Sequence, residues 1–213
     1  MTLLKEFLIS PNIKKFNKFS PKLNIAVLAS GEGSNFQVLI DLSKNKKLDI
    51  NIKMLITNNE NAGCIKKAIN ANIPYFIINQ TIYKTKRDFE NEIIKKLSTT
   101  EIELIVMAGW MRIVTPEFVT RYKQRIINIH PSILPSYKGS KPILDALNNG
   151  SLITGCSVHF VVPEVDSGKL LIQAAMPIDK KDDFLSIKNK IHCLEHIILP
   201  YGISEAGDII RRS

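Results

Sequence analysis

The stretch that decides the fold is Asn24-Ile-Ala-Val-Leu-Ala29, followed by the glycine loop Ser30-Gly-Glu-Gly-Ser-Asn35 and an amphipathic segment at 36–43. The first six residues form a short, largely apolar run, which is typical of a strand covered on both faces. A strand, a glycine loop and a helix in this order predict the opening unit of an α/β protein.

The same alternation of strand and helix continues along the chain. Further short apolar runs predict strands at 52–56, 75–78, 104–107 and 125–129. The segments between them predict helices at 62–71, 86–98 and 116–122, the last with a proline in its first turn. Strands that alternate with helices favour a mainly parallel sheet with helices on both faces.

The pattern changes after Pro131. Two strand-like runs at 154–162 and 170–176 are joined by a loop that contains Asp166-Ser-Gly168. Residues of these types are typical of turns, so the pattern predicts an antiparallel hairpin. A closing helix is predicted at 183–199, with Asp183 at its start and Pro200 past its end.

We therefore expect a single-domain α/β fold with a mainly parallel, Rossmann-like sheet, helices on both faces and a C-terminal antiparallel hairpin. Residues 1–22 are expected to be an N-terminal extension, and residues 23–213 the α/β domain. No repeat or linker divides the chain.

Composition excludes several classes of protein. The chain has 213 residues and 45% hydrophobic residues, which is enough for one well-buried core. No apolar run approaches the roughly 20 residues of a membrane helix, so no membrane partner is expected. The three cysteines lack a Cys-x-x-Cys pair, which argues against a disulfide framework and a cysteine-based zinc site. No signal peptide is evident, and we expect a cytoplasmic protein.

The net charge of +9 has two interpretations. It is compatible with a nucleic-acid partner, but a chain rich in Lys, Asn and Ile also acquires such a charge from an AT-rich genome. A binding module would interleave lysines with exposed aromatic residues on one face, whereas pairs such as Lys66-Lys67 and Lys95-Lys96 lie on predicted helix surfaces. No nucleic-acid partner is expected.

The glycine loop is a candidate anion site. Its residues Gly33, Ser34 and Asn35 lie between a strand and a helix N-terminus, where free N–H groups and the helix dipole suit a phosphate. The third glycine of a dinucleotide fingerprint is missing, because Phe36 stands in its place, and no Walker lysine follows. The alternative is a tight turn that ends in a helix cap.

Asn128-Ile-His-Pro131 carries the strongest chemical signal. Side chains two residues apart on a strand point to one face, so Asn128 and His130 are expected together at the carboxyl end of a central strand. An amide can donate to a developing oxyanion, and a histidine can donate or move a proton. Asp166 is a candidate partner that raises the histidine pKa and orients the ring. The alternatives are a structural histidine and an ordinary turn aspartate.

No metal centre is expected. His159, His192 and His196 form no convincing ligand cluster, and the spacing of the last two lacks the His-Glu-x-x-His pattern. A Gly-x-Ser-x-Gly nucleophile elbow is also absent, which argues against acyl-enzyme chemistry.

Taken together, several stretches resemble the phosphoribosylglycinamide formyltransferases. They are Leu28-Ala-Ser-Gly-Glu-Gly-Ser-Asn35, Met107-Ala-Gly-Trp-Met-Arg-Ile113, Asn128-Ile-His-Pro-Ser-Ile-Leu-Pro135, Thr154-Gly-Cys-Ser-Val-His-Phe160, Asp166-Ser-Gly168 and Glu195-His196 before Pro200. Each stretch alone is weak evidence for this family, but the ordered set of stretches, from about residue 23 to 210, is specific to it.

The resemblance implies transfer of a formyl group from 10-formyltetrahydrofolate to the amine of glycinamide ribonucleotide, a step of purine synthesis. It implies a catalytic trio of Asn128, His130 and Asp166, with Gly33, Ser34, Asn35 and Glu195 on the ribonucleotide. It places the folate along Met111, Arg112, Ile113 and Val114, with Arg87 near its tail and Val162, Pro163, Glu164, Val165 and Asp166 against its pterin. Small-molecule substrates are the expected partners, and monomer and homodimer both stay open.

The chain departs from the family pattern at two places. Gly139-Ser-Lys-Pro142 replaces a histidine-containing run, so that Lys141 stands where a histidine is common, and Trp110 replaces a common Phe. Two related enzymes are alternatives. Formyltetrahydrofolate deformylase usually carries a preceding regulatory domain, and methionyl-tRNA formyltransferase a C-terminal domain; the chain is expected to have room for neither.

Overall fold

A computed structural model describes residues 7–12 and 15–212 of the chain. Its centre is one eight-stranded sheet with the strand order β1-β8-β7-β6-β5-β2-β3-β4. The strands are β1 (Leu8–Ser10), β2 (Leu23–Leu28), β3 (Ile50–Thr57), β4 (Tyr75–Ile77), β5 (Leu104–Met107), β6 (Ile126–His130), β7 (Ile153–Phe160) and β8 (Leu170–Pro177). The helices are α1 (Ser34–Lys44), α2 (Cys64–Ala71), α3 (Lys86–Leu97), α4 (Pro116–Arg121), α5 (Pro142–Asn148) and α6 (Phe184–Arg212), with a 3-10 turn η2 at Gln80–Ile82.

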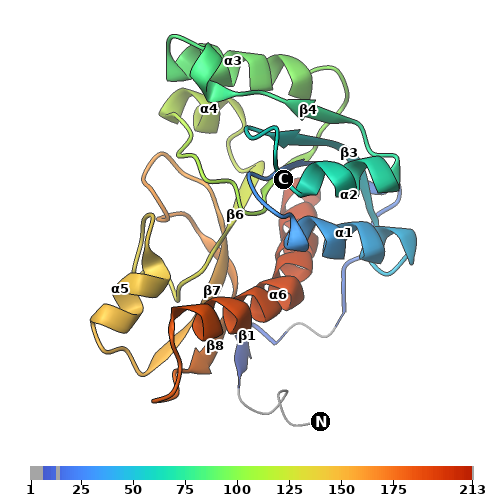
Figure 1. Cartoon of the computed structure of the whole chain (residues 1–213). Helices are drawn as coiled ribbons and strands as arrows, with labels where there is room; N and C mark the ends of the chain where they lie inside the picture. Colours follow the sequence, from blue (N-terminus) through green and yellow to red (C-terminus); the bar gives the residue numbers. More distant parts are fainter. Residues whose placement is uncertain (1–6, 13–14, 213) are drawn as a thin grey trace.

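The two faces of the sheet bury two separate apolar clusters, because side chains alternate along each strand. On β2, Ile25 and Val27 join one cluster with residues of α1, α2, α5 and α6, whereas Ala26 and Leu28 join the other with residues of α3 and α4. Helices therefore cover both faces of the sheet (Figure 1). This confirms the predicted single α/β domain.

The sheet is parallel from β6 to β4 and antiparallel from β6 to β1. The predicted hairpin of β7 and β8 is present. Strand β7 also pairs antiparallel with β6, and in this register Asn128 lies opposite His159. This register sets Phe160, at the end of β7, opposite Ile127 near the amino end of β6, so the β7–β8 loop folds back along β6 to bring Asp166 to His130.

One prediction about the helices is wrong. Pro200 does not follow the last helix but lies inside α6, which begins after Asp183 as expected and runs to Arg212. A proline inside a helix costs about 3 kcal/mol. Ile198, Leu199 and Ile203, all fully buried, offset this cost through their packing. Figure 1 shows the long helix changing direction along its length, as a proline explains.

Helix α5 was not predicted from the sequence. Pro142 occupies the first turn of this helix, where a missing N–H costs nothing. Ile143 and Ala146, three residues apart, bury the inner face.

The expected extension at 1–22 is partly structured; residues 1–6 and 13–14 lie outside the described residues. Leu8–Ser10 adds strand β1 to the edge of the sheet beside β8. The Asn17 backbone N–H donates to Ser204 Oγ at 2.6 Å, and Phe16 packs on Tyr201 with ring centroids 4.6 Å apart. The segment therefore crosses α6 and is fastened to it.

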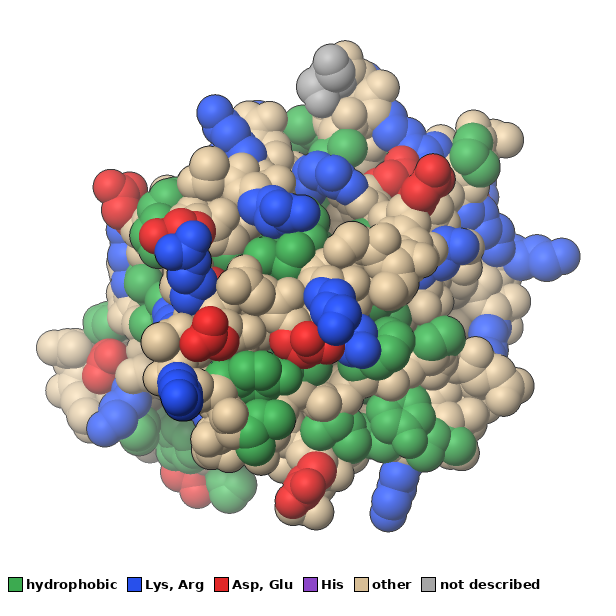
Figure 2. All heavy atoms as spheres, turned by 90° about the horizontal axis from the view of Figure 1, so that it is seen from above, with side chains coloured by type: hydrophobic (Ala, Val, Ile, Leu, Met, Phe, Trp, Pro, Cys, Tyr) green, Lys and Arg blue, Asp and Glu red, His purple; other side chains and the backbone are tan. Residues whose placement is uncertain are grey.

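On one face of the molecule the basic residues do not gather into a single patch. Figure 2 shows Lys and Arg interspersed with Asp and Glu on the face seen from above.

Within 7–12 and 15–212, none of the helices combines the length and the apolar character that crossing a bilayer requires.

Candidate active site

The candidate site lies at the carboxyl edge of the parallel strands, where the loops after β2, β5 and β6 meet. The Ser30 backbone N–H donates to the Gly109 carbonyl at 3.0 Å, and the Met111 N–H donates to Ser30 Oγ at 2.9 Å. These two bonds join the glycine loop to the segment 108–115. This edge is the usual ligand position in open α/β sheets.

The glycine loop has the geometry of an anion site. Gly33 adopts a left-handed conformation with φ of 71°, and a Cβ on it would lie 2.5 Å from Cys64 Cβ. Helix α1 begins directly after it, and no side chain caps the helix. No side chain therefore occupies the first-turn N–H groups, and the assignment of Gly33, Ser34 and Asn35 to a phosphate stays a prediction.

Asn35 connects this loop to α6. Its Nδ2 donates to Glu195 Oε2 at 2.9 Å, although the two residues are 160 positions apart in the sequence. Both side chains are buried, and Asn35 Oδ1 has no hydrogen-bond partner among the described residues. Burial raises the pKa of Glu195 to about 7, with the Asn35 hydrogen bond acting in the opposite direction.

The three predicted catalytic residues come together. His130 Nδ1 lies 3.4 Å from Asp166 Oδ2, with the two side chains only 6% and 9% exposed. Asn128 is two residues before His130 on β6 and shares its face, as expected. Asp166 adopts φ of 49°, and its Oδ2 accepts a hydrogen bond from the Gly139 N–H at 2.9 Å.

A fourth member of this cluster, His159, was missed from the sequence. Its Nε2 lies 3.5 Å from Asp166 Oδ1 and 3.4 Å from Asn128 Nδ2, and the ring is buried. The signal that identifies it is the β6–β7 register, which sets His159 opposite Asn128. A single sequence does not reveal that register.

The segment after β6 fixes the His130 ring through its second nitrogen. His130 Nε2 is 2.9 Å from the Tyr137 carbonyl, and Tyr137 adopts φ of 54°. The buried Ser157 holds this segment, because its Oγ donates to the Ser132 carbonyl at 2.7 Å and accepts from the Leu134 N–H at 3.1 Å. The residues that present the Tyr137 carbonyl are thus anchored to β7.

The pKa values of His130 and Asp166 are both lowered, but by different effects. Burial lowers the pKa of His130, and this effect outweighs the Tyr137 carbonyl and the Asp166 charge, which raise it. Burial acts to raise the pKa of Asp166, but the adjoining His159 ring and the Gly139 N–H outweigh it, so the pKa is lowered. Asp166 is therefore a carboxylate at neutral pH.

The residues predicted to contact folate are mostly on the surface. Met111 and Ile113 are 76% and 61% exposed, a high exposure for apolar side chains, whereas Val114 is buried. Arg112 and Arg87 are also exposed. Arg87 lies in the first turn of α3, whose Phe89 stacks on Trp110, so the helix lies beside the segment that carries Met111. In the hairpin loop, Val162 is half-buried, and Pro163, Glu164 and Val165 are exposed.

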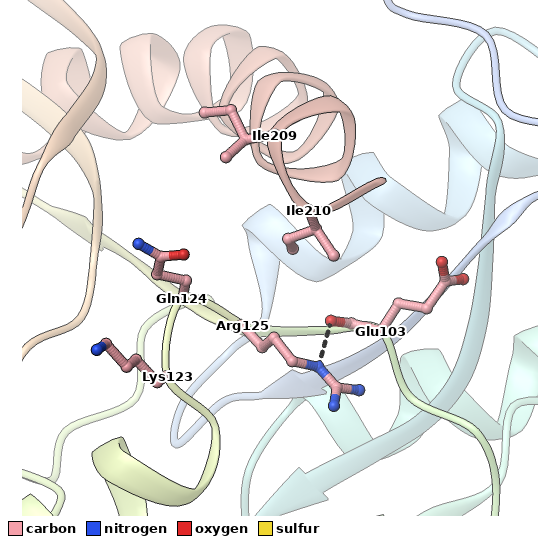
Figure 3. A pocket seen from close by; sticks show the side chains of 6 residues that line it. All are labelled: Glu103, Lys123, Gln124, Arg125, Ile209 and Ile210. Atoms are coloured by element: carbon pink, nitrogen blue, oxygen red, sulfur yellow. Dashed lines mark hydrogen bonds between the residues drawn. The ribbon is translucent and has the colours of Figure 1, made fainter. Parts of the chain in front are cut away.

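A hollow of about 330 Å³ lies away from this edge (Figure 3). It is lined by residues at the amino ends of β5 and β6 and the end of α6: Glu103, Lys123, Gln124, Arg125, Ile209 and Ile210. Arg125 Nε donates to the Glu103 carbonyl at 3.1 Å, so this arginine holds two loops together. The hollow is separate from the predicted site.

The fold and this site define a class of protein. A family model described as "Formyl transferase" matches residues 23–203, and the chain belongs to this family. Among curated proteins, it is similar to phosphoribosylglycinamide formyltransferase of Escherichia coli (strain K12), with 36% identity over 186 residues, 87% of this chain and 88% of that protein.

Two further comparisons agree with this family. The trifunctional purine biosynthetic protein adenosine-3 of Homo sapiens is 38% identical over 182 residues, 85% of this chain. The chain spans less than a fifth of the length of such trifunctional relatives. The solved structure of glycinamide ribonucleotide transformylase 1 from Symbiobacterium toebii matches with a TM-score of 0.86 and 29% identity, covering 92% of each chain.

Proposed function

We propose that this protein transfers the formyl group of 10-formyltetrahydrofolate to the amine of glycinamide ribonucleotide. The observation that carries the proposal is the Asn128–His130–Asp166 cluster at the same sheet edge as the uncapped glycine loop. The similarity to proteins named phosphoribosylglycinamide formyltransferase over most of their length supports the same substrates.

The ribonucleotide has two points of attachment in this proposal. Its phosphate binds the N–H groups after Gly33, where the helix dipole favours an anion. Its ribose hydroxyls or amine meet Glu195 and Asn35. Asn35 Oδ1 is a buried acceptor to which none of the described residues donates, and a donor on the substrate satisfies it.

The folate lies along the exposed apolar surface of Met111 and Ile113, which a flat ring system covers. The hairpin loop at 162–166 closes its pterin side. Arg87 and Arg112 face the glutamate tail, whose carboxylates suit guanidinium groups. Folate then presents its formyl carbon between the ribonucleotide and the catalytic cluster.

The substrate amine is itself the nucleophile, so the protein needs none of its own. Attack of the amine nitrogen on the formyl carbon forms a C–N bond and a tetrahedral oxyanion, which Asn128 and a protonated His130 stabilise. Collapse breaks the bond from the carbon to folate N10. The proton lost by the amine reaches N10 through His130 or through a water held by Asp166.

An acceptor assay tests this function. Purified protein is given 10-formyltetrahydrofolate with glycinamide ribonucleotide, initiator methionyl-tRNA or water alone, and release of tetrahydrofolate is followed. We expect turnover with glycinamide ribonucleotide only. Turnover with water alone identifies a hydrolase and refutes the proposal, and formylation of the tRNA identifies the other transferase.

A further inference from the structure

Asp166 lies between two histidines, and the proposed mechanism uses only one of them. His130 Nδ1 is 3.4 Å from Asp166 Oδ2, and His159 Nε2 is 3.5 Å from Asp166 Oδ1. A single carboxylate neutralises a single positive charge, so the two rings compete for one proton. The contacts of the remaining ring nitrogens and of Asn128 decide between them.

Each ring has its other nitrogen against a backbone carbonyl. His130 Nε2 is 2.9 Å from the Tyr137 oxygen, and His159 Nδ1 is 2.9 Å from the Phe160 oxygen. A carbonyl only accepts, so both of these nitrogens carry hydrogen. Whichever ring is neutral therefore turns a bare nitrogen toward Asp166, and the charged ring turns an N–H toward it.

Asn128 makes the two rings unequal. Its Nδ2 lies 3.4 Å from His159 Nε2, and an amide nitrogen only donates. In either arrangement the charged ring pairs with Asp166 and the neutral ring turns a lone pair toward it, so only the Asn128 contact differs. If His159 holds the proton, two donors face each other at that contact. If His130 holds the proton, the Asn128 amide donates to His159. The second arrangement gains a hydrogen bond and loses a repulsive contact.

A second proton on the cluster is disfavoured by burial. The side chains of His130, His159 and Asp166 are 6%, 2% and 9% exposed. Charging both rings leaves a net positive charge in this enclosed space, which is costly without a further carboxylate.

We propose that His159 is a positioning residue, held neutral with hydrogen on Nδ1, whose bare Nε2 accepts from Asn128 and fixes that amide. One N–H of Asn128 is then committed to His159, and the other is directed at the substrate's formyl oxygen. The mobile proton of the cluster belongs to His130 and Asp166. This role rests on the proposed formyl transfer.

Nitrogen NMR tests the protonation state without an activity assay. The chain contains four histidines, so ring nitrogens labelled with ¹⁵N are assignable by the loss of one signal set in each single variant. Two-bond ¹H–¹⁵N correlations distinguish protonated from bare ring nitrogens. We expect His159 to show a protonated Nδ1 and a bare Nε2 throughout the pH range of turnover. Hydrogen on Nε2 in that range overturns the proposal.

Two substitutions at this position test the positioning role. His159→Leu removes the acceptor. We expect kcat to fall by at least about tenfold, and by no more than the ~100- to 1,000-fold that is typical of a missing oxyanion donor. KM for the ribonucleotide is expected to change little. His159→Gln keeps an acceptor oxygen on a side chain of similar reach, and we expect it to recover most of the loss. His192→Gln, on α6, is the matched control and keeps wild-type kcat.

A double-mutant cycle identifies the residue through which His159 acts. In an Asn128→Ala background, His159→Leu has no amide to release, and we expect less than about a twofold further change in kcat. An equal loss in both backgrounds overturns the proposal. If a variant does not fold, the NMR measurement on the wild-type protein still tests the protonation state proposed for His159. A wild-type protein that formylates nothing contradicts the proposed function instead, which keeps the two failures separate.

Discussion

The carboxyl of Glu195 gives a quantitative prediction for stability against pH. Its pKa rises from an ordinary 4.5 to about 7 in the folded protein, chiefly because the side chain is buried. This rise in pKa corresponds to about 3 kcal/mol. Between pH 4.5 and 7 the folded protein binds more protons at this group than the unfolded chain, so this group lowers the free energy of unfolding as pH rises.

Glu195→Gln removes that titration and keeps an oxygen able to accept from Asn35. We expect the variant to gain about 3 kcal/mol relative to wild type between pH 4.5 and pH 8. His130 acts in the opposite direction, because its lowered pKa makes wild type more stable as pH rises, but this contribution is common to both proteins and cancels in the difference.

Urea unfolding at a series of pH values measures this difference. Glu60→Gln, at an exposed position in the loop after β3, is the matched control for replacing a carboxylate by an amide. A Glu195→Gln difference that stays constant from pH 4.5 to pH 8 refutes the reasoning, because the carboxyl then titrates alike in the folded and unfolded chain.

Further variants test the loop, the folate surface and the N-terminal segment. Gly33→Ala places a Cβ 2.5 Å from Cys64 Cβ at a positive φ, so we expect a loss of about 1–3 kcal/mol in thermal unfolding and a raised KM for the ribonucleotide. Arg112→Ala is expected to raise KM for a polyglutamylated folate more than for a monoglutamate; equal changes contradict a contact with the tail. Deleting residues 1–22 removes the buried Phe19 and strand β1, so we expect at least about 2 kcal/mol less stability, with kcat retained.

The sheet and its edge were predictable because they depend on local patterns. The apolar run before Gly31, and the others like it, predict strands wherever they occur, and parallel strands bring their carboxyl ends together. Asn128 and His130 follow from period-two geometry on one strand. The pairing of His130 with Asp166 was open until the β7–β8 turn was placed against β6.

The features that were not predicted from the sequence depend on contacts between residues that are far apart in the chain. His159 acquires its place from the β6–β7 register, and Tyr137 from a left-handed turn that Ser157 anchors. Pro200 is a helix breaker by local rules, but the burial of α6 residues on both sides overrides that preference. Strand β1 is three residues long and gains its strand character only beside β8.

The central claim is that the cluster around His130 performs the formyl transfer, and single-turnover kinetics test it most directly. Wild type, His130→Ala and Asp166→Asn are mixed with saturating glycinamide ribonucleotide and 10-formyltetrahydrofolate, and formation of the formylated product is timed. We expect each variant to be slower by about 100-fold or more, as for the loss of one group that stabilises an oxyanion. Rates within a few-fold of wild type for both variants would place the chemistry elsewhere.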